Sequence, residues 1–143
     1  MDKFVMANAV FSKFSRNYME LKKGLPIRPS EMGVLNIITE TPPPHTSVLL
    51  AELLGVSKPM ITAHLSVLPE KGYIVKQQTP EDKRVFYILP TEKALTLVER
   101  VKKETCQQLE QVVEALGEER FDLLVELLKE ADQVLEMELQ EDH

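Results

Sequence analysis

Residues 46–93, TSVLLAELLGVSKPMITAHLSVLPEKGYIVKQQTPEDKRVFYILPTEK, contain the pattern that decides the fold. The first part of this stretch predicts a short helix. Val48, Ala51 and Leu54 recur at a spacing of three, which makes one apolar stripe. Gly55 follows at a position where a helix can end in a left-handed conformation. We therefore expect this helix to stop sharply at a tight turn.

A second helix is predicted immediately after this turn. Ser57 is placed to cap it, and Pro59 falls in its first turn, where a missing backbone N–H is harmless. The apolar residues expected to face inward are Ile61, Leu65 and Leu68. The residues left on the outer face are small or polar, namely Lys58, Thr62, Ala63 and Ser66. Two short helices joined by a glycine-bearing turn, with such an outer face, are typical of a helix-turn-helix.

A β-hairpin is predicted to follow the second helix. Gly72 ends the helix, and residues 73–78 and 85–89 are rich in side chains that favour strands. Residues 79–84, TPEDKR, form a polar tip between these two runs. A helix-turn-helix followed by a hairpin predicts a winged helix.

The stretch resembles the MarR-type winged-helix transcriptional regulators. The resemblance lies in residues 49–74 (LLAELLGVSKPMITAHLSVLPEKGYI), the wing sequence PEDKR, and TEKA at 91–94, where the family usually has Thr-Glu-x-Gly. It implies a mainly α fold with a small β-hairpin wing, made of a winged helix-turn-helix and an α-helical dimerisation region. It also implies a homodimeric regulator, usually a repressor, that binds palindromic operators in double-stranded DNA and responds to a ligand or to redox state.

Apolar stripes at helical spacing flank the winged helix. One runs through Phe4, Ala7, Phe11, Phe14, Tyr18 and Leu21, and others through Leu95, Val98, Val101, Leu109, Val112 and Leu116 and through Phe121, Leu124, Leu128, Ala131 and Leu135. A helix of about 25 residues spans almost 40 Å, longer than a small winged helix can cover. We therefore expect residues 1–24 and 92–143 to form a helical dimerisation region with a second copy, and residues 25–91 to form the DNA-binding domain.

The candidate DNA-binding residues lie on the second helix of the motif and on the wing. They are Ser57, Lys58, Pro59, Met60, Thr62, Ala63, Ser66, Lys76, Asp82, Lys83 and Arg84. The helix residues are expected to approach the major groove, and the lysines to contact phosphates. The resemblance implies that Asp82 and Arg84 form the family's Asp-x-Arg pair, in which the carboxylate orients the guanidinium for the minor groove. The alternative is a solvated helix face and a solvated hairpin tip.

Three residues depart from the family pattern on this helix. Ala63 and Val67 stand where many relatives have arginine, so the commonest specific contact, Arg to guanine, is missing. We expect modest affinity or an A·T-rich operator. Pro69 cannot donate a hydrogen bond to the carbonyl of Leu65, and we expect it to kink the helix or end it early. These departures leave a second interpretation open, a winged-helix protein-interaction module that has lost sequence-specific DNA binding.

A ligand pocket is a further expectation from the resemblance, because family pockets lie between the dimerisation helices and the winged helix. Candidate lining residues for a small aromatic or phenolic acid are Phe11, Phe14, Tyr18, Arg28, Met32 and Asn36. Arg28 would meet the carboxylate of the ligand. The alternative is core packing, because an aromatic stripe at helical spacing belongs to a core more often than to a pocket.

Charge distribution is consistent with a DNA-reading module attached to acidic helices. The 143-residue chain has a formal net charge of −6. Residues 46–93 contain six Lys/Arg and five Asp/Glu, a net +1, so the remainder carries −7. No run approaches the roughly 20 apolar residues of a membrane span, and the N-terminus lacks the pattern of a signal peptide. We expect a cytoplasmic protein without a membrane partner.

An enzyme is not expected, because no phosphate-binding loop, nucleophile elbow, HExxH motif or paired cysteine ligands occur. The three histidines lack metal-ligand spacing, and we expect no metal and no cofactor. His45 looks like a surface residue. Cys106 is the single cysteine, which excludes an intrachain disulfide, and we interpret it as structural or incidental and not as a redox sensor.

Overall fold

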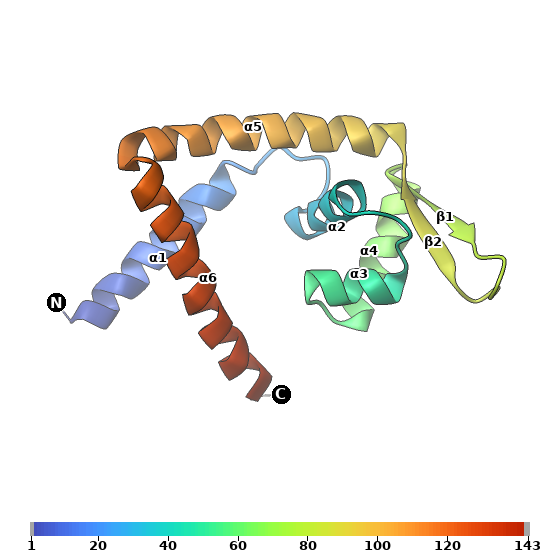
Figure 1. Cartoon of the computed structure of the whole chain (residues 1–143), viewed down its shortest axis with the longest axis horizontal. Coiled ribbons are helices and arrows are strands. Elements are labelled where there is room, and N and C mark those ends of the chain that lie inside the picture. Colours follow the sequence, from blue (N-terminus) through green and yellow to red (C-terminus); the bar gives the residue numbers. More distant parts are fainter. Residues whose placement is uncertain (1, 142–143) are drawn as a thin grey trace. The chain divides into compact units, whose positions relative to one another are not determined.

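The computed structural model describes residues 2–141, which form six helices and one two-stranded antiparallel sheet (Figure 1). The helices are α1 (Lys3–Glu20), α2 (Pro29–Glu40), α3 (Ser47–Leu54), α4 (Lys58–Glu70), α5 (Glu92–Leu116) and α6 (Glu118–Glu141), and the strands are β1 (Ile74–Gln78) and β2 (Phe86–Pro90). The chain divides after Val98 into two compact units, so α5 begins in the first unit and continues into the second. The predicted fold class, mainly α with a small hairpin wing, is confirmed.

The turn between α3 and α4 is formed by the residues expected from the sequence. Thr46 Oγ1 accepts a hydrogen bond from the Leu49 N–H (3.3 Å) and caps α3. Gly55 ends α3 with φ of +65°, a conformation that side chains disfavour. Ser57 Oγ then accepts from the Met60 N–H (3.3 Å) and caps α4. The helix-turn-helix geometry therefore follows from local sequence signals.

Helices α2, α3 and α4 pack together with the hairpin around the core of the first unit. The predicted inward residues of α4, Ile61, Leu65 and Leu68, are all buried, and Met32, Leu35 and Ile38 of α2 are buried as well. On α3 the prediction was wrong at Val48, which is 56% exposed, whereas Leu50 is fully buried. At about 100° per residue, Leu50 lies about 40° around the helix from the half-buried Leu54, whereas Val48 lies about 120° from it.

Pro69 does not end α4 early, so that part of the expectation was wrong. The helix continues to Glu70, and the Lys71 N–H donates to the Val67 carbonyl (3.1 Å). The Tyr73 N–H donates to the Leu68 carbonyl (2.9 Å) beyond the end of the helix. Because Pro69 lies in the last turn, its missing N–H removes a single bond close to where the ladder would stop in any case.

The hairpin pairs Ile74 with Pro90 at its base and Gln78 with Phe86 next to the tip. Ile74 and Ile88 are buried, so one face of the hairpin completes the core. His45 contributes to this arrangement, because its carbonyl accepts a hydrogen bond from the Ile88 N–H (2.8 Å).

The flanking helices leave much of their apolar surface exposed in the single chain. The exposed side chains include Phe4, Phe11 and Phe14 on α1, Leu21 at its C-cap, and Leu128, Val134, Leu135, Met137 and Leu139 on α6. On α5, Leu95 is exposed, and the buried residues near it are Ala94, Leu97 and Val98. Among residues 2–141, no single helix is both long and apolar enough for a membrane span; only α3 and α4 taken together, with a 116° bend, pass on length and composition.

Candidate nucleic-acid interface

The outer face of α4 and its N-cap present all seven helix residues predicted to approach DNA. Ser57, Lys58, Pro59, Met60, Thr62, Ala63 and Ser66 are exposed. Because Ser57 Oγ accepts the capping bond from Met60, its own O–H remains available to donate. Thr62 Oγ1 donates to the Lys58 carbonyl (2.9 Å), which leaves its oxygen able to accept. This face can thus both donate and accept hydrogen bonds.

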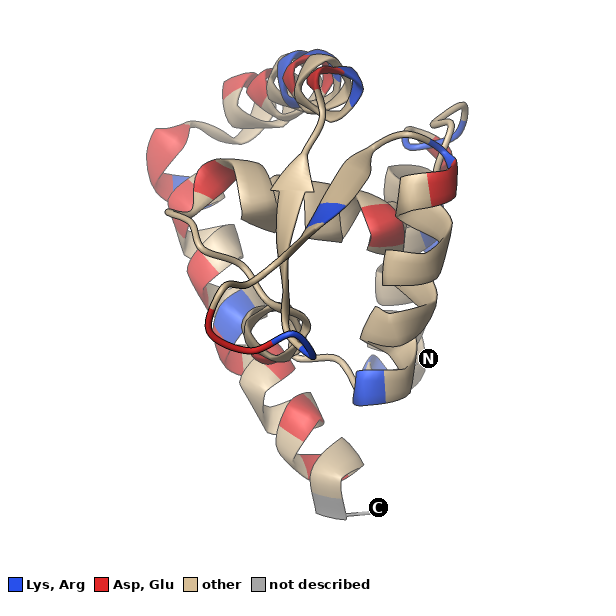
Figure 2. Ribbon diagram, turned by 90° about the vertical axis from the view of Figure 1, so that its right-hand side faces the viewer, with Lys and Arg blue, Asp and Glu red and all other residues tan. Residues whose placement is uncertain are grey.

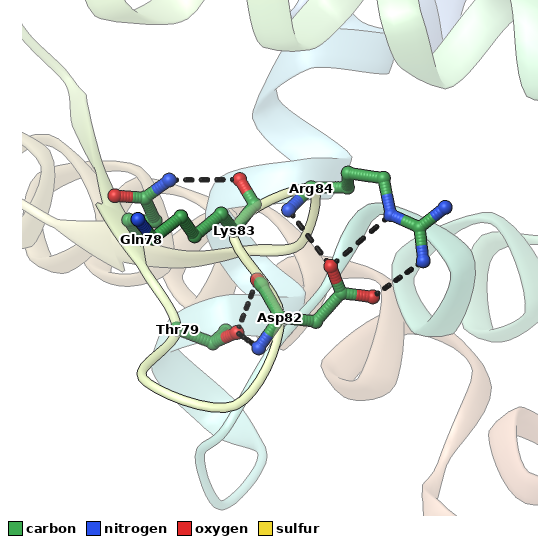
Figure 3. A network of polar contacts seen from close by, with 5 residues as sticks. All are labelled: Gln78, Thr79, Asp82, Lys83 and Arg84. Carbon is green, nitrogen blue, oxygen red and sulfur yellow. Dashed lines mark hydrogen bonds and ion pairs between the residues drawn. The ribbon is translucent and has the colours of Figure 1, made fainter.

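Asp82 and Arg84 form a bidentate ion pair at the wing tip (Figure 3). Asp82 Oδ1 accepts from the Arg84 backbone N–H (2.9 Å) and from Nε (3.2 Å), and Oδ2 accepts from the guanidinium NH2 group (3.4 Å). The backbone hydrogen bond, followed by the guanidinium, holds the pKa of Asp82 below its usual value. The Arg84 side chain is nevertheless 91% exposed, so it is oriented without being covered.

Two residues that the sequence analysis did not single out complete this loop. Thr79 Oγ1 donates to the Asp82 carbonyl (2.7 Å) and accepts from the Asp82 N–H (3.1 Å), and Gln78 Nε2 donates to the Lys83 carbonyl (2.8 Å) (Figure 3). The signal in the sequence was a threonine at the start of a polar tip, three residues before an aspartate, where a hydroxyl can bond to backbone within a turn.

A groove of about 360 Å³ lies between α4, the start of α3 and the wing. Three of the residues that line it are cations, Lys58, Lys76 and Arg84. The other lining residues are polar or apolar, namely Ser47, Val48, Thr62, Leu65, Ser66, Val85, Phe86 and Ile88. The groove therefore brings together five of the predicted DNA-binding residues and carries no acidic residue in its lining. Ser47 and Val48 belong to it and were not predicted.

The remaining predicted residues surround the groove without lining it. Ser57, Pro59, Met60 and Ala63 lie on the exposed part of α4 and its cap, and Asp82 and Lys83 lie in the wing loop. Figure 2 shows acidic and basic residues next to each other along this loop, and acidic residues repeated along α6. Three of the six Lys/Arg residues in 46–93 line the groove, and none of the five Asp/Glu residues does.

The C-terminal end of α4 is held by the start of α5. Thr91 Oγ1 donates to the Gly72 carbonyl (2.6 Å), and the Thr91 N–H donates to the Tyr73 carbonyl (3.1 Å). Lys93 Nζ donates to the Lys71 carbonyl (2.6 Å). These bonds satisfy carbonyl groups just beyond the helix, where no intrahelical partner exists. The position of α4 is therefore coupled to the first turn of α5.

The residues predicted to bind a ligand have mixed surroundings. Phe14 and Tyr18 stack with ring centroids 6.1 Å apart. Phe11, Arg28 and Asn36 are exposed, whereas Met32 is 4% exposed and is part of the core.

Glu31, next to these residues, was not predicted as part of any site. Its carboxylate is buried, accepts from the Arg28 N–H (2.9 Å) and lies 3.8 Å from Lys71 Nζ. Glu31 thereby satisfies the N-cap backbone N–H of α2, which is the contribution of the N3 glutamate in a capping box.

Comparison with known proteins agrees with this geometry. Residues 27–86 match the model of the MarR family. A MarR protein from Peptoclostridium difficile is 27% identical, with a TM-score of 0.68 over 97% of this chain and 88% of that one.

Two further structures show the same fold at lower identity. One is FabT of Streptococcus pneumoniae in complex with DNA (22% identity, TM-score 0.79, 93% of this chain and 97% of that one). The other is the PcaV transcriptional regulator of Streptomyces coelicolor in complex with its natural ligand (15% identity, TM-score 0.78, 93% and 96%). With the helix-turn-helix, the hairpin wing and the match over residues 27–86, the chain is similar to the MarR family of winged-helix transcriptional regulators.

Proposed function

We propose that this protein is a homodimeric, sequence-specific DNA-binding repressor that binds a palindromic operator and is released by a small aromatic or phenolic ligand. The observation that supports DNA binding most directly is the groove lined by Lys58, Lys76 and Arg84, between an exposed helix face and a wing whose arginine is already oriented. One of the structures with the same fold, FabT of Streptococcus pneumoniae, was solved in complex with DNA.

The groove lies where a binding site for the backbone of one DNA strand is expected. If α4 enters the major groove and the wing enters the adjacent minor groove, the sugar–phosphate strand that separates the two grooves must pass between them. The three cations on the groove walls would meet its phosphates. The apolar lining, which includes Val48 and Phe86, would contact its sugars.

Base recognition would come from the exposed face of α4. Ala63 and Met60 offer apolar contact to thymine methyl groups, and Thr62 and Ser66 offer hydroxyl groups to base edges. Because no arginine lies on this face, Arg–guanine contacts would be absent. The wing arginine would favour a narrow minor groove. We therefore expect the operator to be rich in A·T pairs both where α4 enters the major groove and where the wing enters the minor groove.

Dimerisation would follow from the apolar surface that a single chain leaves exposed on α1 and α6. We propose that residues 1–24 and 92–143 form the dimer interface and that residues 25–91 bind DNA. A two-fold axis would then present two copies of α4 about 34 Å apart, one helical turn of DNA, and the operator would be palindromic.

Release by an effector is proposed for the region around α1 and the start of α2. Phe11, Phe14 and Tyr18 would provide an aromatic wall, and Arg28 would pair with a carboxylate. Met32 and Asn36 would complete the site, which for the buried Met32 requires α2 to shift. Because α4 is coupled to the start of α5, a ligand that favours another arrangement of the flanking helices would also change the position of α4.

The test is binding of the purified protein to its own upstream intergenic DNA, compared with scrambled DNA of equal length, across a salt series. Two copies of Lys58, Lys76, Lys83 and Arg84 would neutralise up to eight phosphates, so the logarithm of the affinity should fall with log salt with a slope of up to about −7. Ligands would then be screened by loss of binding.

The alternative is a protein-interaction module, favoured by the absence of arginine at positions 63 and 67. In that case the protein would show no preference for upstream DNA even at low salt. Binding to a protein partner through an apolar surface would also depend only weakly on salt. A flat salt response together with equal binding to both DNAs would therefore overturn the proposed function.

A further inference from the structure

Thr79 is the one buried residue of the wing loop. Its side chain and backbone together are 5% exposed, whereas Pro80, Glu81, Lys83 and Arg84 around it are exposed. Its hydroxyl group makes two hydrogen bonds to the backbone of a single residue, donating to the Asp82 carbonyl (2.7 Å) and accepting from the Asp82 N–H (3.1 Å). The Asp82 peptide groups are therefore held from both sides by one side chain (Figure 3).

These contacts continue through Asp82 to Arg84. Once the backbone of Asp82 is fixed, its carboxylate is placed to accept from the Arg84 N–H (2.9 Å) and from the guanidinium. The Thr79 N–H also donates to the Val85 carbonyl (3.0 Å), which closes the loop immediately after Arg84. Gln78 Nε2 adds one more hydrogen bond to the loop by donating to the Lys83 carbonyl (2.8 Å). All of these hydrogen bonds join residues of the wing loop and its two ends.

We propose that Thr79 is a positioning residue for DNA binding, which holds the wing tip so that Arg84 is oriented before DNA arrives. This inference rests on the proposed function. An exposed arginine on a mobile loop loses both backbone and side-chain freedom when it binds, and that loss weakens binding. A loop that is already ordered in the free protein avoids most of this loss.

The test compares Thr79→Val with Thr79→Ser. Valine has nearly the shape of threonine but can neither donate nor accept, whereas serine retains the hydroxyl group. We expect Thr79→Val to lower operator affinity about 10-fold, because it removes the two hydrogen bonds that order the loop. The operator affinity of Thr79→Ser should stay within about 3-fold of that of the natural protein.

The salt series separates positioning from direct contact. Thr79→Val removes no charge, so the salt slope should stay unchanged while the affinity falls at every salt concentration. Arg84→Ala, by contrast, should lower the affinity and make the slope less steep by about 1 for each wing. An unchanged affinity in Thr79→Val, or a change of slope as in Arg84→Ala, would overturn the proposal.

A second measurement needs no DNA. Backbone ¹⁵N relaxation of residues 82–84 and of the Arg84 Nε–H in the free protein should show an ordered tip in the natural protein and in Thr79→Ser, and a mobile tip in Thr79→Val. Gln78→Ala, at an exposed position, removes only the side-chain bond to the Lys83 carbonyl and should loosen Lys83 alone. A rigid tip in Thr79→Val would overturn the proposal. If the natural protein has no operator preference, the proposed function fails, and relaxation still decides whether Thr79 orders the wing.

Discussion

The ammonium group of Lys93 lies 4.5 Å from the centre of the Tyr73 ring and 2.6 Å from the carbonyl oxygen of Lys71. Lys93 is in the first turn of α5, whereas Lys71 and Tyr73 follow the recognition helix α4. A single side chain thus joins the helix that leads out of the winged helix to the end of the helix proposed to bind DNA.

We predict that Lys93→Met lowers the free energy of unfolding by about 1 kcal/mol, because a charge-assisted hydrogen bond and an exposed cation–π contact are lost while the aliphatic stem is retained. Urea denaturation at fixed protein concentration measures this change. Lys129→Met is the matched control, since Lys129 is exposed on α6 and pairs only with Glu126 at 3.5 Å among the ion pairs described. Equal effects of the two substitutions would show that the Lys93 contacts contribute nothing specific.

Asp82→Asn separates pre-orientation of Arg84 from simple electrostatics. Removing a negative charge beside DNA should strengthen binding if charge alone matters. If the carboxylate acts by orienting Arg84, its loss should weaken binding about 3- to 10-fold, because an amide accepts from the guanidinium less strongly than a carboxylate does. Operator titrations of both proteins at equal salt give the sign of the change. Tighter binding by Asp82→Asn would remove orientation from the mechanism.

Much of the winged helix could be predicted because its signals are local. Gly55, Ser57 and Pro59 each act on their own turn of chain, and the structure uses all three as expected. The Asp82–Arg84 contact spans two residues, so its geometry also depends on nearby sequence alone.

What could not be predicted depends on contacts between distant residues. Within the apolar helix α3, periodicity alone could not decide that Leu50 and not Val48 faces the core, because the choice is made by α2 and α4. His45 was expected at the surface and this was wrong. Its carbonyl bonds to Ile88 in the wing, more than forty residues along the chain, and it is buried. The contact of the Thr79 hydroxyl with Asp82, three residues along the chain, is local, and its signal was in the sequence but was overlooked.

Burial of His45 predicts a stability that depends on pH. Burial lowers the pKa of its imidazole from the ordinary value of 6.5, because the charged form is desolvated. Below pH 6.5 the unfolded chain therefore binds a proton that the folded chain resists, so the stability falls as the pH decreases from about 7 towards the folded-state pKa and is fully present above that range. His45 Nε2 lies 2.6 Å from Thr41 Oγ1. The Thr41 hydroxyl group donates its hydrogen to the Ile37 carbonyl (2.6 Å), so its oxygen accepts from His45.

Urea denaturation at pH 7.5 and pH 5.5 tests this prediction. The natural protein should be less stable at the lower pH, and His45→Gln should lose part of that difference, because its amide does not titrate and can still donate to Thr41. Comparison of the pH-dependent differences, and not of the absolute stabilities, removes any packing cost of the substitution. The same pH difference in both proteins would assign the effect to other groups.

The exposed apolar stripe of α1 predicts a dimer that a single charge should weaken. Phe11 is 65% exposed in the single chain, yet it lies in line with Phe4, Phe14 and Tyr18 at helical spacing. A row of large apolar side chains on one helix face is unfavourable in water unless a partner covers it. We predict that the protein is a dimer by light scattering at micromolar concentration and that Phe11→Glu shifts it towards the monomer.

Ala9→Glu is the matched control for this shift, because Ala9 is exposed on the opposite side of the same helix and the substitution adds the same charge. The control should remain a dimer. In Phe11→Glu the two winged helices would no longer be joined, so the preference for a palindrome over an isolated half-site should disappear although each wing and recognition helix is intact. A natural protein that is monomeric, yet binds a palindrome and a half-site equally well, would contradict the symmetric mode of operator binding and leave the single winged helix as the unit that reads DNA.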